Sequence, residues 1–297
     1  MGKKKVSKTR SFGTPKRESH DSSLFYESKL YQNIPKSHVI KQIDNSKNIP
    51  IEYINTIIHG DSQSMDTLPD ESIHFAVTSP PYNVRKEYDD NLGLTEYLEL
   101  LRNVFLETWR VLVPGGRIAI NIANIGRKPY IPLHTYVIHL MDEIGFLMRG
   151  EIIWDKSASA GISCAWGSFG SASNPVLRDV HEYIMVFSKQ TMKRAKNDKK
   201  DSIRNEDFVQ WSKSIWSFPT VSAKKIGHPA PFPVELPKRL IEFYTYQEDV
   251  ILDPFIGSGS TAIAALETNR RFIGYEINQK YVTLANERIR KYFVEQQ

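Results

Sequence analysis

Val250-Ile251-Leu252-Asp253-Pro254-Phe255-Ile256-Gly257-Ser258-Gly259-Ser260-Thr261 is the stretch that decides the fold of this chain. A short apolar run leads into a loop with two glycines, and an alanine-rich segment, residues 262–266, follows the loop. This order predicts a strand, a tight turn and the start of a helix, the first half of a β-α-β unit. Glycine lets a backbone approach a ligand closely, and the first turn of a helix offers N–H groups that have no partner.

A second apolar run, residues 271–275, follows the predicted helix and ends at Glu276. An acidic residue about 20 positions after such a loop lies where these folds bind ribose hydroxyls. The loop lacks the full G-x-G-x-x-G pattern of dinucleotide sites, so it favours a nucleoside ligand without a pyrophosphate. Turn chemistry alone leaves an ordinary strand-to-helix turn open.

The same alternation of strand and helix continues through the rest of the chain. Apolar runs predict strands at residues 56–61, 73–77, 117–122, 146–154 and 179–187. Apolar side chains spaced by three or four residues predict helices at 94–112, 133–144, 234–246 and 281–292. We therefore expect an α/β fold with a mostly parallel sheet and helices on both of its faces.

Length and composition limit the class of protein. The chain has 297 residues, 40% of them hydrophobic and 25% charged, which fits one elaborated α/β domain or a domain with an insertion. The sequence shows neither an apolar stretch of about 20 residues nor an N-terminal apolar core, so we expect a cytoplasmic protein without a membrane span. The single cysteine, Cys164, excludes an internal disulfide and a cysteine zinc cluster.

The N-terminus is basic, whereas the rest of the chain is nearly neutral. Seven lysines and arginines and no acidic residue lie within residues 1–17, and the whole chain has a net charge of +5. We expect residues 1–30 to form a disordered arm. Such an arm either contacts phosphate groups or serves only as a solubilising end, and the composition leaves both open.

Ser79-Pro80-Pro81-Tyr82 directly follows the strand predicted at residues 73–77. Two prolines cannot continue a central strand, so this string begins a loop at the carboxyl end of the strand, the edge where ligands bind. Ser79 Oγ and the Pro80 carbonyl are rigidly held acceptors, which suit the N–H groups of an exocyclic amine on a nucleobase. Tyr82 offers a flat ring for a base taken out of the duplex. On its own, the string is equally compatible with a stiff surface turn.

The Ser79 and Asp253 strings together resemble the catalytic and S-adenosylmethionine motifs of the β class of DNA amino-methyltransferases, in which the catalytic motif comes first. The resemblance runs from about Ile57 to Arg290. It implies a Rossmann-like methyltransferase sheet, S-adenosylmethionine as cofactor, no metal and double-stranded DNA as substrate. The catalytic loop that it implies consists of Ser79, Pro80, Pro81 and Tyr82.

The resemblance also implies a set of cofactor residues. The loop would hold the methionine end of the cofactor, Glu276 the ribose hydroxyls and Asp61 the adenine amino group, with His228-Pro229 as a further cofactor motif. The full set is Asp61, His228, Pro229, Asp253, Phe255, Gly257, Ser258, Gly259 and Glu276.

Two departures from the adenine-N6 members favour cytosine N4 as the target. Those members usually have Asp at the Ser79 position, and their pre-cofactor motif often reads His-Pro-Thr-Gln-Lys-Pro rather than the His228–Pro233 string found here. Adenine N6 remains the alternative. C5 methylation needs a nucleophilic cysteine beside a proline, whereas Cys164 is flanked by Ser163 and Ala165.

Two segments interrupt the alternation and are the expected contacts with DNA. The region at about 189–223 mixes cations with aromatic residues, and the Ser- and Gly-rich segment 157–178 would assist it as an accessory loop. The predicted DNA-binding residues are Lys193, Arg194, Lys196, Lys199, Lys200, Arg204, Trp211 and Trp216. A solvated surface insertion is the alternative. The methyltransferase domain, residues 50–297, would then consist of a catalytic half, 50–188, and a cofactor half, 224–297.

We thus expect a site-specific DNA methyltransferase, acting as a monomer or homodimer, that protects host DNA in a restriction-modification system. Its partner would be a cognate endonuclease acting on the same site without a stable complex. A catalytically idle DNA-binding relative and an RNA or protein amine methyltransferase are the competing interpretations.

Overall fold

The computed structural model describes residues 7–8, 20–32, 34, 46–82, 92–159, 167–226 and 231–294, in two compact units, 1–37 and 38–297. The smaller unit contains the paired two-residue strands β1 (Ser7–Lys8) and β2 (His20–Asp21) and the short helix α1 (Ser23–Tyr26). A turn of 3₁₀ helix, η1 (Lys29–Tyr31), follows. The predicted disordered arm, residues 1–30, therefore has short regular elements in its described part.

The larger unit is built on a sheet whose described strands lie in the order β3-β10-β9-β4-β5-β7-β6-β8. These strands are β3 (Thr56–His59), β4 (Ile73–Thr78), β5 (Leu112–Ile122), β6 (Phe146–Asp155), β7 (His181–Lys189), β8 (Ile215–Ser217), β9 (Val250–Asp253) and β10 (Arg271–Glu276). Every neighbouring pair is parallel except those of β7, which runs antiparallel to both β5 and β6. The prediction of a mostly parallel sheet is confirmed.

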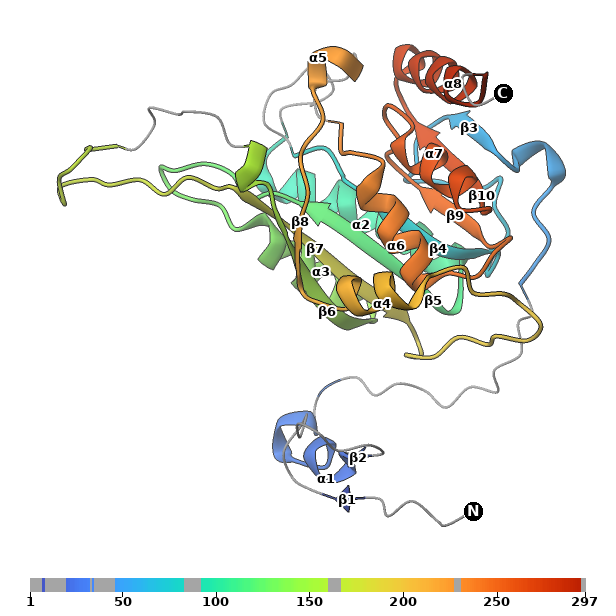
Figure 1. Cartoon of the computed structure of the whole chain (residues 1–297), viewed down its shortest axis with the longest axis horizontal. Coiled ribbons are helices and arrows are strands. Elements are labelled where there is room, and N and C mark those ends of the chain that lie inside the picture. The colour runs from blue at the N-terminus through green and yellow to red at the C-terminus, as the bar shows by residue number, and fades with distance from the viewer. Residues whose placement is uncertain are drawn as a thin grey trace. The chain divides into compact units, whose positions relative to one another are not determined.

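Helices cover both faces of this sheet, as expected (Figure 1). The helices α2 (Leu94–Val111) and α3 (Leu133–Ile144) pack on one face, and α6 (Glu235–Tyr244), α7 (Ser260–Glu267) and α8 (Gln279–Val294) pack on the other. Two short helices, α4 (Asn205–Trp211) and α5 (Ala223–Ile226), lie between β7 and α6 in the chain, and the 3₁₀ turns η2 (Ile51–Tyr53) and η3 (Ser157–Ser159) complete the unit.

The strand sequences explain this layering. Successive residues of a strand point to opposite faces, so a central strand must be apolar on both. In β4, Phe75 and Val77 belong to the core under α6 and α7, whereas Ala76 belongs to the core under α2 and α3. The helix boundaries also follow the sequence: α3 ends at Gly145, whose φ of 100° is a left-handed conformation that glycine adopts without strain.

Among the described residues, no helix combines the length and the apolar character that crossing a bilayer requires.

Candidate active site

The carboxyl ends of four parallel strands bring the predicted site residues together. Asp61 follows β3, Ser79 follows β4, Asp253 ends β9 and Glu276 ends β10. Since these four strands are neighbours in one parallel sheet, their ends meet at the same edge. The predicted catalytic and cofactor strings, about 170 residues apart in the chain, therefore share one site.

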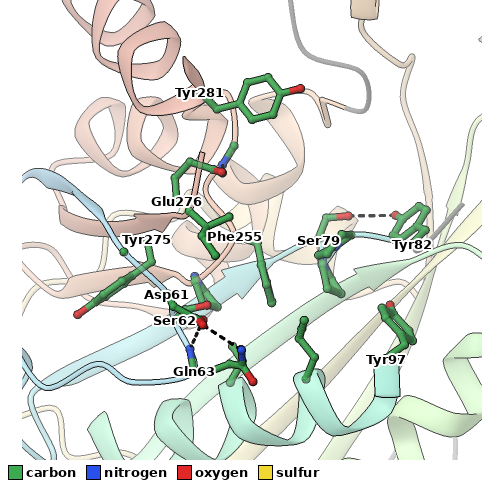
Figure 2. Close-up of a pocket in the computed structure, with 18 of the residues that line it drawn as sticks. Asp61, Ser62, Gln63, Ser79, Tyr82, Tyr97, Phe255, Tyr275, Glu276 and Tyr281 are labelled. Carbon is green, nitrogen blue, oxygen red and sulfur yellow. Dashed lines mark hydrogen bonds between the residues drawn. The ribbon is translucent and has the colours of Figure 1, made fainter. Parts of the chain in front are cut away.

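A cavity of about 270 Å³ opens at this edge, and Figure 2 shows the predicted cofactor and catalytic residues around it. Its described lining includes two carboxylates, those of Asp61 and Glu276, but no lysine, arginine or histidine. Pyrophosphate would need cationic partners here, whereas a cationic ligand would be attracted by the carboxylates. The lining residues are Gly60, Asp61, Ser62, Gln63, Ser79, Pro80, Pro81, Tyr82, Leu92, Tyr97, Leu100, Val104, Pro254, Phe255, Gly257, Tyr275, Glu276, Ile277 and Tyr281.

Glu276 is held by backbone amides at one end of the cavity. Its Oε2 accepts a hydrogen bond from the Gly257 N–H at 3.1 Å, and its Oε1 accepts one from the Asn278 N–H at 2.9 Å. Burial raises the pKa of Glu276, although these amides oppose the rise. Gly257, with a φ of 49°, adopts the left-handed conformation that turns its N–H toward the carboxylate. The carboxylate is thereby fixed while it faces the cavity.

Asp61 and Phe255 also line the cavity, as the sequence predicted. The two carboxylate oxygens of Asp61 accept hydrogen bonds from the backbone and side-chain nitrogens of Gln63, at 2.9 and 3.0 Å. Figure 2 shows Asp61 and Gln63 beside Phe255 and across the cavity from Tyr82.

Asp253 does not reach the cavity, which corrects the prediction that it contacts the cofactor. Its side chain is fully buried, and its Oδ1 accepts hydrogen bonds from Thr78 Oγ1 at 2.7 Å and the Phe255 N–H at 3.1 Å. Its Oδ2 accepts one from Thr261 Oγ1 at 2.5 Å. Burial raises the pKa of Asp253 to about 6, against the effect of these donors. Asp253 thus ties the residue before Ser79 to the glycine loop and to α7.

Ser258 and Gly259 likewise have structural roles rather than the predicted contact with the cofactor. Arg288 Nη1 donates to the Ser258 carbonyl at 2.9 Å and to its Oγ at 3.1 Å, and the Ser258 side chain is buried. Gly259 begins α7 with a φ of 81°, and a Cβ atom there would lie 3.2 Å from Ala285 Cβ. His228 and Pro229 lie outside the described residues.

The catalytic loop is organised by its own hydroxyl groups. Ser79 Oγ and Tyr82 Oη are 3.0 Å apart (Figure 2), and Tyr82 Oη donates to Glu182 Oε2 at 3.2 Å. Burial and then the negative charge of Glu182 raise the pKa of Tyr82 well above its usual value, so the phenol stays protonated. Pro80 and Pro81 line the cavity beside them.

Three polar residues behind this loop were missed by the sequence analysis: Asn121, Lys156 and Glu182. Asn121 Nδ2 donates to Glu182 Oε2 at 2.6 Å, and Lys156 Nζ lies 2.5 Å from Glu182 Oε1. Asn121 is a polar residue near the end of a buried strand, a pattern that was visible in the sequence. Glu182 was hidden, because it begins β7 and reaches this edge only since β7 is antiparallel.

The basic segment predicted to bind DNA packs at the opposite, amino edge of the sheet. Arg194 is buried and bound through both Nη atoms to Asp249, which precedes β9, at 2.6 and 2.7 Å. Lys199 Nζ lies 3.0 Å from Asp249 Oδ1. Asp249 and Asp253 flank β9, and four residues of strand span roughly 13 Å. The predicted DNA contact of Arg194 is therefore wrong, because its charge is neutralised inside the protein.

The aromatic residues of the same region belong to the core. Trp216 is 2% exposed, and its indole N–H donates to the Trp211 carbonyl at 3.1 Å. The Arg239 guanidinium lies 5.7 Å from the Trp216 ring and 5.8 Å from the Trp211 ring. The predicted DNA contact of Trp216 is thus also wrong, and Trp211 is partly buried against the same core.

The remaining predicted DNA-binding cations are exposed or partly exposed near the amino edge. Lys196 forms an ion pair with Asp201, and Arg204 Nε lies 2.6 Å from Asp207 Oδ2. Lys193 and Lys200 are exposed. Among the residues that the structure describes, no group of three or more His, Cys, Asp or Glu side chains is placed to hold a metal ion.

Comparison with known proteins identifies the relatives of this chain. Residues 73–287 match the family model described as DNA methylase, which covers N6 and N4 methyltransferases. The Type II methyltransferase M.MjaI of Methanocaldococcus jannaschii is 32% identical over 287 residues, 81% of this chain and 93% of its own length. The DNA adenine methyltransferase YhdJ of Escherichia coli K12 is 30% identical, over 79% of this chain and 82% of its own length.

Solved structures show the same fold. TTHA0409 of Thermus thermophilus, a DNA modification methylase crystallised with S-adenosyl-L-methionine, has a TM-score of 0.65 and 29% identity. The match covers 80% of this chain and 93% of that chain. The cytosine-N4-specific PvuII DNA methyltransferase has a TM-score of 0.61 with 24% identity, over 78% of this chain and 85% of that chain, a likeness of fold alone.

Proposed function

Because the chain belongs to the DNA methylase family, as a β-class DNA amino-methyltransferase, we propose that it methylates the N4 amine of a flipped cytosine in duplex DNA. It is a DNA methyltransferase of the restriction-modification type, and S-adenosylmethionine is its cofactor. The choice of cytosine N4, the flipping of the base and the roles of individual residues are the proposal.

The observation that carries the proposal is the shared cavity with its carboxylates. Ser79 and Tyr82 line one side of it, and Asp61, Phe255 and Glu276 line the other. S-adenosylmethionine fits the described lining, because it brings a positive sulfonium and no phosphate. Glu276 would hold the ribose hydroxyls and Asp61 the adenine amino group, since each carboxylate is held by amide donors and still faces the cavity.

The cofactor supplies a methyl group whose carbon–sulfur bond breaks, with its electron pair left on sulfur, as the amine nitrogen forms its bond to the methyl carbon. The lone pair of an exocyclic amine is delocalised into the base. Acceptors at Ser79 Oγ and the Pro80 carbonyl would hold the two N–H groups and favour a pyramidal nitrogen, which frees that lone pair. The nitrogen then loses one proton.

Ser79 is the residue that favours cytosine N4 over adenine N6. Serine at this position is typical of cytosine-N4 members, whereas adenine-N6 members usually have Asp there. Relatives include a DNA adenine methyltransferase, so adenine N6 is the second candidate. We further propose that the enzyme works in the cytoplasm of a prokaryotic cell, beside a cognate endonuclease of the same site specificity.

Methyl transfer from labelled S-adenosylmethionine to unmethylated genomic DNA, followed by nucleoside analysis of the digest, tests the proposal. We expect N4-methylcytosine. N6-methyladenine would keep the family and refute the target base. A protein that binds the cofactor but yields no methylated nucleoside from DNA would refute the DNA-methylating function, and RNA and protein substrates would be tried next.

A further inference from the structure

Glu182 lies behind the catalytic loop, outside the described lining of the cavity, and nothing in the proposed reaction uses it so far. Its side chain is 13% exposed, and both of its oxygens are engaged. Oε1 faces Lys156 Nζ at 2.5 Å, whereas Oε2 accepts hydrogen bonds from Asn121 Nδ2 at 2.6 Å and from Tyr82 Oη at 3.2 Å. A carboxylate held by three donors is therefore in contact with a residue of the catalytic loop.

The direction of the hydrogen bonds follows from the number of protons. A carboxylate has none, so each of its partners must donate. Tyr82 has a single hydroxyl proton, and burial keeps the phenol protonated. If that proton points to Glu182, Tyr82 Oη can only accept in its 3.0 Å bond with Ser79, and Ser79 must donate its own proton to Tyr82. The remaining lone pairs of Ser79 Oγ are then directed away from Tyr82.

We propose that Glu182 is a positioning residue that, through Tyr82, makes the neutral Ser79 a hydrogen-bond acceptor for the target amine and receives the amine proton after methyl transfer. This inference rests on the proposed amine methylation. It answers a difficulty of the Ser79 loop: an aspartate at position 79 would be an acceptor without help, whereas a serine can as well donate. The carboxylate that the loop lacks is supplied from β7.

Asn121 fixes the carboxylate in this role. Its amide nitrogen, not its oxygen, must face Glu182, because two oxygens 2.6 Å apart without a proton between them would repel each other. The same nitrogen lies 3.4 Å from Ser79 Oγ, a long contact that uses at most one of the two lone pairs. One lone pair of Ser79 is therefore left for the amine.

The proton transfer balances along the same chain. After the nitrogen–carbon bond has formed, the amine proton moves to Ser79 Oγ, the Ser79 proton moves to Tyr82 Oη, and the Tyr82 proton moves to Glu182 Oε2. Both hydroxyl groups end as they began, and Glu182 becomes a carboxylic acid next to Lys156. The methylated amine nitrogen carries a positive charge at this moment and is a far stronger acid than a carboxylic acid, so the transfer is downhill.

The test is a double-mutant cycle with Glu182→Gln and Tyr82→Phe, measured as single-turnover methylation of duplex DNA that contains the mapped site. Glutamine has the shape of glutamate but can donate to Tyr82, which lets the chain reverse and turns the Ser79 proton toward the amine. We expect Glu182→Gln to lower the rate by about 10²-fold, the scale for losing one preorganised polar partner. The double variant should be no slower than the slower single variant, because Glu182 acts only through Tyr82.

Two further measurements separate this role from a structural one. Cofactor affinity by calorimetry and the KM for DNA should be unchanged in Glu182→Gln, and urea unfolding should show a folded protein. Glu143→Gln, the same change in an exposed ion pair between α3 and Arg102 of α2, serves as the matched control and should leave the rate unchanged.

The outcomes distinguish this inference from the function on which it rests. An unchanged rate in Glu182→Gln, additive losses in the double variant, or an equal loss of cofactor affinity would each overturn the role of Glu182. A wild-type protein that methylates adenine would leave it standing, because that amine also has two N–H groups. A wild-type protein that methylates no DNA would overturn the proposed function and this role with it.

Discussion

Two aspartates flank β9, and they show how differently the two edges of the sheet are built. Burial alone would raise the pKa of Asp249, before the strand, but the cations His74, Arg194 and Lys199 hold it below the usual value. Asp253, at the end of the strand, is equally buried but receives only neutral donors, so burial raises its pKa to about 6. The amino edge is a closed ion-pair cluster, whereas the carboxyl edge uses its carboxylates to organise the loops of a cavity.

The comparison shows why a basic segment is a poor guide to nucleic-acid contact. Lysines and arginines suit phosphate groups and buried carboxylates equally well, and the sequence does not show which of them faces the cation. Here Asp249, more than 40 residues after Arg194 in the chain, takes up that charge. A ligand site is marked instead by charges that the protein holds in place but does not neutralise.

Removing Asp249 should have the largest effect on stability. Asp249→Ala leaves the buried guanidinium of Arg194 without its partner, which costs about 3–5 kcal/mol of unfolding free energy. Urea denaturation measures this loss. The methylation rate per folded molecule should be unchanged, and a rate loss in fully folded protein would contradict the separation of the two edges.

Ser79→Ala should show the reverse pattern. Loss of the hydroxyl acceptor is expected to lower the methylation rate by about 10²–10³-fold, equivalent to about 2.7–4 kcal/mol, because one preorganised partner of the amine is missing. Cofactor affinity by calorimetry and the urea midpoint should change little. Equal damage to cofactor affinity would refute the assigned role of Ser79.

The dependence of stability on pH should reveal Asp253. Its folded-state pKa of about 6 lies above the usual 3.8, so its contribution is fully present below pH 3.8 and is lost as the pH rises through 6. The size is of the order of 2–3 kcal/mol. Asp253→Asn removes this titration, and the difference in unfolding free energy between wild type and variant should change over this pH window. A constant difference would refute the raised pKa.

The smallest effect is expected for Arg204→Ala. Its exposed ion pair with Asp207 should be worth less than about 1 kcal/mol in urea denaturation. Because Arg204 lies near the amino edge, the slope of log affinity for DNA against log salt concentration should also stay the same. A slope that falls by about 0.9 would instead show that Arg204 neutralises one phosphate.

Much of the site could be predicted because local sequence determined it. The Ser79 string and the Asp253 string both follow apolar strands, and parallel strands necessarily bring their carboxyl ends to one edge. Asp61, Phe255, Gly257 and Glu276 accordingly lie at the cavity together with the catalytic loop. Asp253, Ser258 and Gly259 were placed at the correct edge, but their side chains or backbone serve the loop itself.

The sequence by itself determined the elements, their order and the edge at which the two motifs meet, because turn residues and apolar periodicity act over a few neighbouring positions. Only the tertiary structure decided which charges are neutralised and in which direction β7 runs. These depend on contacts between distant segments, such as Arg194 with Asp249 and Glu182 with Tyr82. A reversed strand exchanges the ends of every residue on it, and that reversal brings Glu182 to the catalytic loop.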